Sequence, residues 1–170
     1  LSAELYYHGQ LELLPRLGRA WQQLACRIPK LQLWHNGGTP AWLQEAFRLL
    51  GIPAHRQIDA HRHPHLQATT LLVPAFTSPF GQPGPASLDW LRTFWGAAVA
   101  ALPTEPNLRQ PSGLMLARPP QQRRPLLQHT AWVRQLNRQG VELANSATSV
   151  TRQLQALQRC EQVVAVHGGA

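Results

Sequence analysis

Lysine is almost missing from this chain, and acidic residues are few. The 170 residues contain 16 Lys and Arg against 8 Asp and Glu, a formal net charge of +8, and Lys30 is the only lysine. Because the planar guanidinium group suits phosphate and carboxylate, one interpretation is an anionic partner; the other is a GC-rich genome that encodes arginine for lysine. Only Arg123 and Arg124 adjoin, so no basic stripe predicts a nucleic-acid partner.

Cysteine is equally scarce, and long apolar runs are absent. Cys26 and Cys160 lie far apart without a CxxC companion, which argues against zinc and against a disulfide framework and is typical of a reducing compartment. No apolar run approaches the roughly 20 residues that span a bilayer, and no export signal is visible. We therefore expect a cytoplasmic protein without a transmembrane segment. Because Leu1 is not an initiator Met, we also expect that the natural N-terminus lies upstream.

Metal-binding motifs are missing as well. Four histidines gather between residues 55 and 65, but no carboxylate or cysteine accompanies them at a standard ligand spacing, so a surface loop is favoured over a metal site. These are His55, His61, His63 and His65. The chain also has no Asp-x-Asp motif that could hold a magnesium-bound diphosphate. We therefore expect neither a metal nor another cofactor.

The chain does contain a regular alternation of apolar segments with Gly, Pro and polar clusters. This alternation predicts helices and strands in turn, and hence an α/β fold with parallel sheets. In the first part of the chain the expected elements are a helix over 9–28 that is kinked or restarted at Pro15, a strand within 30–38, a buried strand over 68–76 and an amphipathic helix over 85–102.

Residues 39–51 have the signals of a further helix in order. Thr39 is the expected N-cap, Pro40 the expected first helical residue, and Gly51 follows the expected end.

A stretch rich in Pro and polar residues, 104–113, predicts a linker. Beyond it the alternation restarts and predicts a βαβαβ unit, in which a crossover helix joins each strand to the next parallel strand. The expected elements are strands over 114–119, 141–145 and 162–169, and helices over 126–140 and 149–160.

The last predicted strand leads directly into His167, Gly168 and Gly169. Open parallel sheets bind ligands beyond the carboxyl ends of their strands, where free N–H groups and helix N-termini favour anions. Glycines let a phosphate or sugar approach the backbone, and histidine donates to a phosphate or carries a proton. The alternative is a plain glycine turn.

Two further groups are candidates for chemistry. His8 and Glu12 stand four residues apart on one helix face, and a carboxylate beside an imidazole serves as a general base if both line a cleft; the alternative is an exposed helical pair. Arg118 ends a strand, and Arg123 and Arg124 precede a helix. From there guanidinium groups could clamp a diphosphate, and the alternative is a solvated loop.

In their order along the chain, these segments resemble glycosyltransferase family 61, sugar-transferring enzymes with two Rossmann-like lobes in the GT-B arrangement. Residues 5–17, "LYYHGQLELLPRL", resemble the family pattern N-Y-Y-H-W-x-x-[DE]-x-L-P-R-L. "LGI" at 50–52 matches the end of a first-lobe helix, and "VVAVHGGA" at 163–170 resembles a strand that leads into H-G-A-G. Arg118, Arg124 and Gln153 match as well.

The chain departs from the family pattern at several positions. Leu5 replaces Asn, Gly9 replaces Trp, and Gln128 with His129 replace an N-E pair. Family chains also continue through a further helix and strands after H-G-A-G. The resemblance therefore implies that residues 114–170 are an incomplete lobe, and it leaves the activity of the 170 residues by themselves open.

The resemblance implies an inverting glycosyltransferase that moves a sugar from a nucleotide-sugar donor to a hydroxyl of a glycan or another acceptor, in surface or capsular polysaccharide synthesis. It implies an acceptor-side lobe over 1–103, a linker over 104–113 and a nucleotide-sugar-binding lobe over 114–170. In its terms Glu12 or His8 activates the acceptor, while the donor is held by Arg118, Arg124, His167, Gly168 and Gly169. The alternative is a non-catalytic α/β module that binds nucleotides or acidic polymers.

Overall fold

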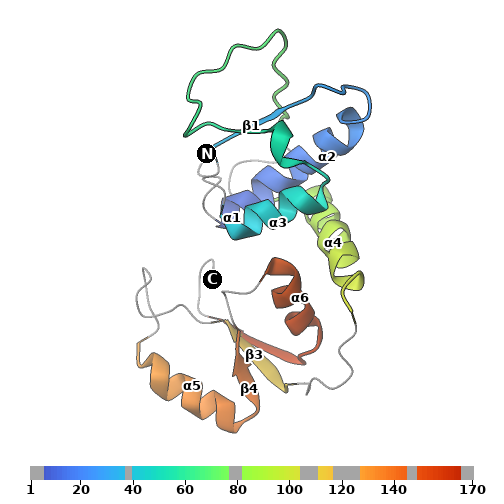
Figure 1. The fold of residues 1–170 in the computed structure, drawn as a ribbon. Helices are drawn as coiled ribbons and strands as arrows, with labels where there is room; N and C mark the ends of the chain where they lie inside the picture. The colour runs from blue at the N-terminus through green and yellow to red at the C-terminus, as the bar shows by residue number, and fades with distance from the viewer. Residues whose placement is uncertain are drawn as a thin grey trace. The chain divides into compact units, whose positions relative to one another are not determined.

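The structure is a computed structural model that describes residues 6–36, 40–76, 82–103, 111–116, 127–144 and 149–165. The chain divides into two compact units, residues 1–98 and 99–170 (Figure 1). Both contain helices and short parallel strands, so the predicted α/β class is confirmed. Within the described residues, no helix combines the length and the apolarity that a bilayer crossing requires.

The first unit begins with one continuous helical stretch. It consists of α1 (Tyr6–His8), a π-helical turn (Gly9–Leu13) and α2 (Leu14–Leu24). The helix that the sequence predicts over 9–28 is therefore present, although it begins earlier and ends earlier. Its apolar face is the buried one: Leu14, Leu17 and Trp21 are less than a tenth exposed.

A small parallel sheet follows the first helix. Strand β1 (Leu33–His35), helix α3 (Ala41–Leu49) and strand β2 (Gln57–Asp59) form a single βαβ unit, with a 3₁₀ turn (Ala54–Arg56) before β2. The two strands pair in parallel, so that the last residue of β1 faces the last residue of β2 across the ladder. Leu43, Ala46 and Phe47 of α3 are fully buried and supply much of the core of this unit.

Helix α3 ends as the sequence predicts but begins one residue later. Pro40 has extended ψ and is the N-cap, so the helix starts at Ala41 and not at Pro40; Thr39, the expected cap, lies outside the described residues. At the other end Gly51 has φ +69. The N–H of Ile52 donates to the carbonyl of Phe47 at 2.9 Å, which is the hydrogen bond of a Schellman motif.

Helix α4 (Pro85–Ala100) completes the core of the first unit and confirms the amphipathic helix predicted over 85–102. Its buried residues recur every four positions: Ser87, Leu91, Trp95 and Val99. The indole ring of Trp90 lies against Gly18 of α2 so closely that a methyl group on that glycine would overlap it. Close approach at a glycine therefore brings α2 and α4 together.

The prediction of a buried strand over 68–76 is wrong. This segment has no strand, and Leu71 and Val73 are 67 % and 72 % exposed. Pro74 cannot donate to a ladder, which weakens the segment as a central strand. The apolar run does match a buried strand in composition, but helices α2 and α3 already fill the core of this unit.

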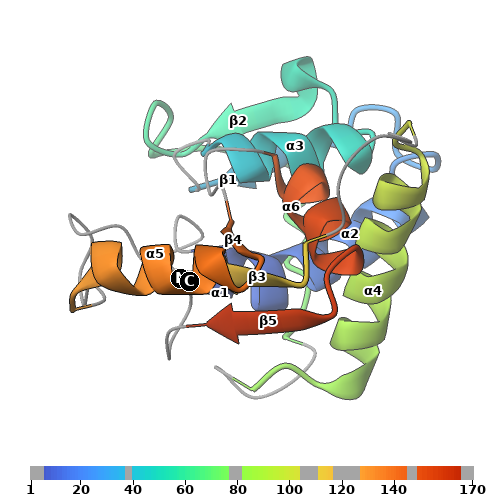
Figure 2. The ribbon, with the colours of Figure 1, turned by 90° about the horizontal axis from the view of Figure 1, so that it is seen from below.

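The second unit is the βαβαβ unit that the sequence predicts. Strands β3 (Gly113–Leu116), β4 (Val141–Leu143) and β5 (Gln162–Ala165) are parallel and lie in the order β4-β3-β5. Helix α5 (His129–Arg138) connects β3 to β4, and α6 (Val150–Gln158) connects β4 to β5. Because the two crossovers run in opposite directions across the sheet, right-handed connections place the two helices on opposite faces, as Figures 1 and 2 show.

Burial in the second unit is concentrated on the central strand. Leu114 and Met115 of β3 are each 4 % exposed, whereas all four residues of β5 are exposed.

Local signals determine where the helices begin and end. Gly140, with φ +79, follows α5, and the Ser149 hydroxyl accepts a hydrogen bond of 3.3 Å from the Arg152 N–H at the start of α6.

We expect two glycine substitutions in the first unit to act in opposite directions. A methyl group meets nothing within 4 Å at either Gly51 or Gly96, but only Gly51 has a positive φ. Gly51→Ala should destabilise by about 1–2 kcal/mol because L-residues avoid the left-handed region, whereas Gly96→Ala, inside α4, should stabilise by about 0.5–1 kcal/mol.

Urea unfolding followed by tryptophan fluorescence measures both effects, since five of the six tryptophans lie in residues 1–98. A shift of both midpoints in the same direction would show that φ does not decide the outcome.

Candidate functional site

The π turn in the first helix has a local cause in Pro15. Proline lacks an N–H, and its ring collides with the carbonyl four residues earlier in a regular α-helix. Here the N–H of Leu14 instead donates to the carbonyl of Gly9, five residues back, which widens the turn immediately before the proline. Single π turns inside α-helices frequently occur at functional sites.

The wide turn brings His8 and Glu12 together, as their spacing predicts. His8 Nδ1 lies 3.1 Å from Glu12 Oε1. The pair is not the exposed helical pair of the alternative interpretation, because the Glu12 side chain is only 7 % exposed and that of His8 is 25 % exposed. A buried carboxylate next to an imidazole is an arrangement suited to proton transfer.

Two more polar residues, Gln10 and Arg16, belong to the same helical stretch. Gln10 is 8 % exposed, and its Oε1 accepts a hydrogen bond of 3.0 Å from Trp95 Nε1 of α4. Burial lowers the pKa of Arg16, and the neighbouring negative charge of Glu12 acts against that shift. A guanidinium group keeps its charge in proteins, so Arg16 supplies a cation beside the buried carboxylate. We call His8, Gln10, Glu12 and Arg16 the π-turn cluster.

The π-turn cluster also has unused hydrogen-bond donors. Among the described residues, neither Gln10 Nε2 nor Arg16 Nε has a hydrogen-bond partner, although both atoms are buried. Buried donors are paired in most proteins, and an unpaired one costs about 1–3 kcal/mol. Two buried N–H donors of the first helical stretch therefore remain without a partner in the described structure.

Aromatic rings form the exposed rim of the π-turn cluster. Tyr6 and Tyr7 are about two fifths exposed, and the ring of Tyr7 stands edge-on to His8 with centroids 5.4 Å apart. The ring of Tyr6 stands edge-on to Trp42 at 5.5 Å. Burial, and secondarily the negative charge of Glu45, raises the pKa of Tyr6. Apolar rings around a few polar groups are the usual lining of a small-molecule site.

In the second unit the sheet edge of interest is the carboxyl edge. β3 and β5 end side by side there, because Leu116 and Ala165 are partners in the parallel ladder. In the sequence Arg118 comes two residues after Leu116, and His167 comes two residues after Ala165. The predicted donor-binding residues Arg118, Arg124, His167, Gly168 and Gly169 all lie outside the described residues.

The start of α5, on this same edge, contains a strained residue. Gln128 is the N-cap of α5 and has φ 55 and ψ 33, the left-handed region. Among the described residues it is the only non-glycine with positive φ. A side chain there costs about 1–2 kcal/mol, and such strain clusters at functional sites.

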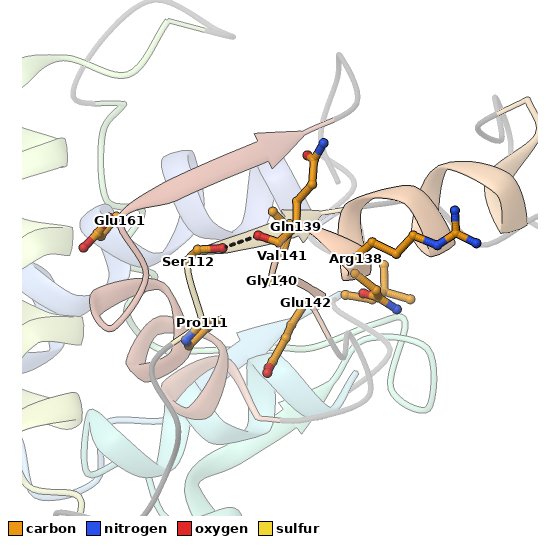
Figure 3. A pocket seen from close by; sticks show the side chains of 10 residues that line it. Pro111, Ser112, Arg138, Gln139, Gly140, Val141, Glu142 and Glu161 are labelled. Atoms are coloured by element: carbon orange, nitrogen blue, oxygen red, sulfur yellow. Dashed lines mark hydrogen bonds between the residues drawn. The ribbon is translucent and has the colours of Figure 1, made fainter.

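The hollow drawn in Figure 3 lies at the other edge of the same sheet. It is bordered by Ser112, Gly140 and Glu161, the residues that precede β3, β4 and β5. Between two of its lining residues, the Ser112 hydroxyl donates to the Gln139 carbonyl at 2.8 Å. The hollow is open to solvent and sits at the amino ends of the strands, whereas parallel sheets bind ligands at the carboxyl ends. We therefore do not assign the site to it.

His35 is a buried imidazole that the sequence analysis missed. It is the last residue of β1, it is 7 % exposed, and its ring packs against Phe47 with centroids 5.1 Å apart. Burial lowers its pKa; Asp59, its ladder partner on β2, acts in the opposite direction, and His61 adds to the lowering. His35 Nδ1 has no hydrogen-bond partner within the described part of the chain. A neutral imidazole with a free nitrogen thus lies at the carboxyl edge of the first sheet.

A signal for His35 was present in the sequence. "HNGG" at 35–38 and "HGG" at 167–169 both place a histidine and a glycine pair after a strand. The four histidines between residues 55 and 65 are exposed, and no group of three potential ligands is placed to hold a metal within the described residues.

Acidification is expected to destabilise the first unit through His35. Its folded pKa lies below the ordinary value of about 6.5, so as the pH falls below that value the unfolded chain binds the proton first and stability is lost. The drop in urea midpoint from pH 7 to about pH 5.5 should be smaller in His35→Gln than in the parent. His55→Gln, at an exposed position, is the control and should keep the full drop; an undiminished drop in His35→Gln would contradict the assignment.

Comparison of the chain with protein-family models, with curated proteins and with solved structures found no match, so the sequence motifs and the geometry above carry the functional assignment.

Proposed function

We propose that this chain carries the site of a cytoplasmic inverting glycosyltransferase, which moves a sugar from a nucleotide-sugar donor to a hydroxyl of a glycan or another acceptor. The proposal includes two Rossmann-like lobes in a GT-B arrangement, with the donor on the second lobe and the acceptor on the first. The observation that carries it is the burial of Glu12 against His8 on a π turn, at the position of the family's first motif.

The donor side is supported by the topology of the second unit. With the order β4-β3-β5, the chain reverses its direction of travel across the sheet after β4, so β3 and β5 flank a topological switch point. Nucleotides bind in the crevice at such a point because the loops on either side diverge to opposite faces. We propose that Arg118 and Arg124 bind the diphosphate there, and that the loop of His167, Gly168 and Gly169 completes the donor site.

The acceptor side is supported by the π-turn cluster. In the proposed step, Glu12 or His8 takes the proton of the acceptor hydroxyl, and the resulting oxygen attacks the anomeric carbon from the face opposite the diphosphate. The bond to the diphosphate breaks as the new bond forms, which inverts the configuration. Charge then develops on the leaving diphosphate, and fixed guanidinium groups stabilise it without a metal.

Glu12 and His8 can divide this work in two ways. Either the carboxylate takes the proton itself, or it orients His8 and stabilises the imidazolium that forms. The Arg16 guanidinium group, four residues after Glu12, would then bind an oxygen of the acceptor.

A non-catalytic nucleotide-binding module is the second candidate, and the departures from the family pattern favour it. Gly9 replaces an expected tryptophan, and the structure gives a reason: a methyl group there would overlap the Trp42 ring, so Trp42 of α3 occupies the space. Such a module would bind nucleotides but would not transfer sugar.

Arg118→Ala is expected to weaken binding of nucleoside diphosphates by about tenfold or more, since a charge-assisted hydrogen bond is lost. Titration calorimetry with UDP, GDP and CDP measures this. Arg123→Ala, which removes the same charge from the same stretch of sequence, is the control and should bind like the parent. Equal loss in both variants would mean that general charge, and not a site at Arg118, holds the nucleotide.

Glu12→Gln is expected to abolish transfer while nucleotide binding stays unchanged. The amide keeps the volume of the buried side chain but cannot accept a proton. Transfer is measured with a panel of nucleotide sugars and acceptor glycans, and the melting temperature is measured in parallel. If Glu12→Gln transferred sugar at the parent rate, the acceptor-side proposal would fail; if the parent bound nucleotides without any transfer, the binding module would be correct.

A further inference from the structure

The proposed sugar transfer gives no role to a long exposed apolar segment that follows β2. Every residue from 61 to 73 is exposed. The segment continues to Phe76 without a helix or strand, and we call residues 61–76 the apolar loop. Its exposed large hydrophobics are Leu66, Leu71, Leu72, Val73 and Phe76. Long loops without secondary structure are uncommon in compact domains and are usually functional, and contiguous exposed apolar surface indicates a binding surface.

Both ends of the apolar loop are attached to the first unit. At its start, the N–H groups of Arg62 and His63 donate to the Asp59 carbonyl at 3.1 and 2.9 Å, and Trp34 Nε1 donates to the His63 carbonyl at 3.1 Å. At its end, the Arg16 guanidinium carbon lies 4.0 Å from the centroid of the Phe76 ring. The intervening residues are therefore held away from the core between two fixed points, as Figure 1 shows for the loop after β2.

The charge of the apolar loop has a single sign. Residues 60–76 contain Arg62 and three histidines and no acidic residue. The whole chain has a formal net charge of +8. A second copy of the chain would thus bring like charges together, which disfavours self-association through this loop. An occupant with an apolar interior and a negatively charged surface is complementary.

We propose that the apolar loop docks the protein onto an anionic lipid bilayer. Leu71, Leu72 and Val73 enter the boundary between head groups and acyl chains, while Arg62 contacts the anionic head groups. Interfacial attachment of this kind combines buried apolar area with electrostatic attraction and needs no membrane-spanning helix. The proposal does not rest on sugar transfer, although Arg16 of the π-turn cluster contacts Phe76 at the end of the loop.

Vesicle flotation tests the proposal with the full chain. The parent should bind phosphatidylcholine vesicles that contain about one third phosphatidylglycerol more tightly than pure phosphatidylcholine vesicles. The double variant Leu71→Ser/Val73→Ser should lose about tenfold or more of its partition coefficient, because each buried methylene contributes to insertion. These side chains are exposed, so the variant should fold like the parent.

A matched control removes two exposed apolar side chains elsewhere. Leu127→Ser/Trp132→Ser changes two side chains of the second unit that are 81 % and 51 % exposed, and it should bind like the parent. The proposal is overturned if the parent fails to bind vesicles, or if both double variants bind equally well. Equal binding of the two variants would mean that scattered arginines alone hold the protein on the lipid.

Insertion itself can be followed with an environment-sensitive dye. Leu72→Cys in a chain without Cys26 and Cys160, labelled with a nitrobenzoxadiazole group, should shift its emission to the blue when anionic vesicles are added. The same label at Trp132→Cys should not shift. An unshifted emission at position 72, under conditions where the protein floats with the vesicles, would also overturn the proposal.

Discussion

Burial of the Glu12 carboxylate is the constraint on which the first unit depends. A carboxylate taken out of water loses its hydration, and only nearby cations or hydrogen-bond donors offset that loss. Here His8 lies 3.1 Å away, and Arg16 approaches from the next turn of the helix. The π turn places all three on one side of the helix, and Pro15 is the reason that a π turn forms at this point. A helix-breaking residue thus becomes part of the site.

In the proposed function the second unit has a different role. Its described residues include no side-chain cluster comparable to that around Glu12, but the strand order brings two strand ends together where the chain reverses direction. Backbone N–H groups and helix N-termini face a ligand at such an edge. Gln128 at the start of α5 has left-handed backbone, a kind of strain that clusters at functional sites. The proposed transfer would need both proton transfer on the first unit and anion binding on the second.

Much of the second unit, and helices α2, α3 and α4, could be predicted from the sequence. The signals that specify them are local. Gly140 with positive φ, the Ser149 cap and the Gly51 end of α3 each act on their own turn of backbone. The structure of the segment over 68–76 could not be predicted in this way. An apolar run indicates only that burial of its side chains would be favourable. Which surface covers the run depends on the rest of the fold, and in the first unit the helices pack on one another.

In the candidate site, too, the features with a local sequence signal could be predicted and the others could not. Spacing alone predicted that His8 and Glu12 would meet, but their burial depends on α3 and α4, which come much later in the sequence. The contact of Gln10 with Trp95, 85 residues away, has no local signal at all. His35 had a signal, the glycine pair that follows in the sequence, but only the folded structure shows that its imidazole is buried against the ring of Phe47. The surroundings of the candidate site residues are therefore determined by contacts between elements far apart in the sequence, which the local motifs do not reveal.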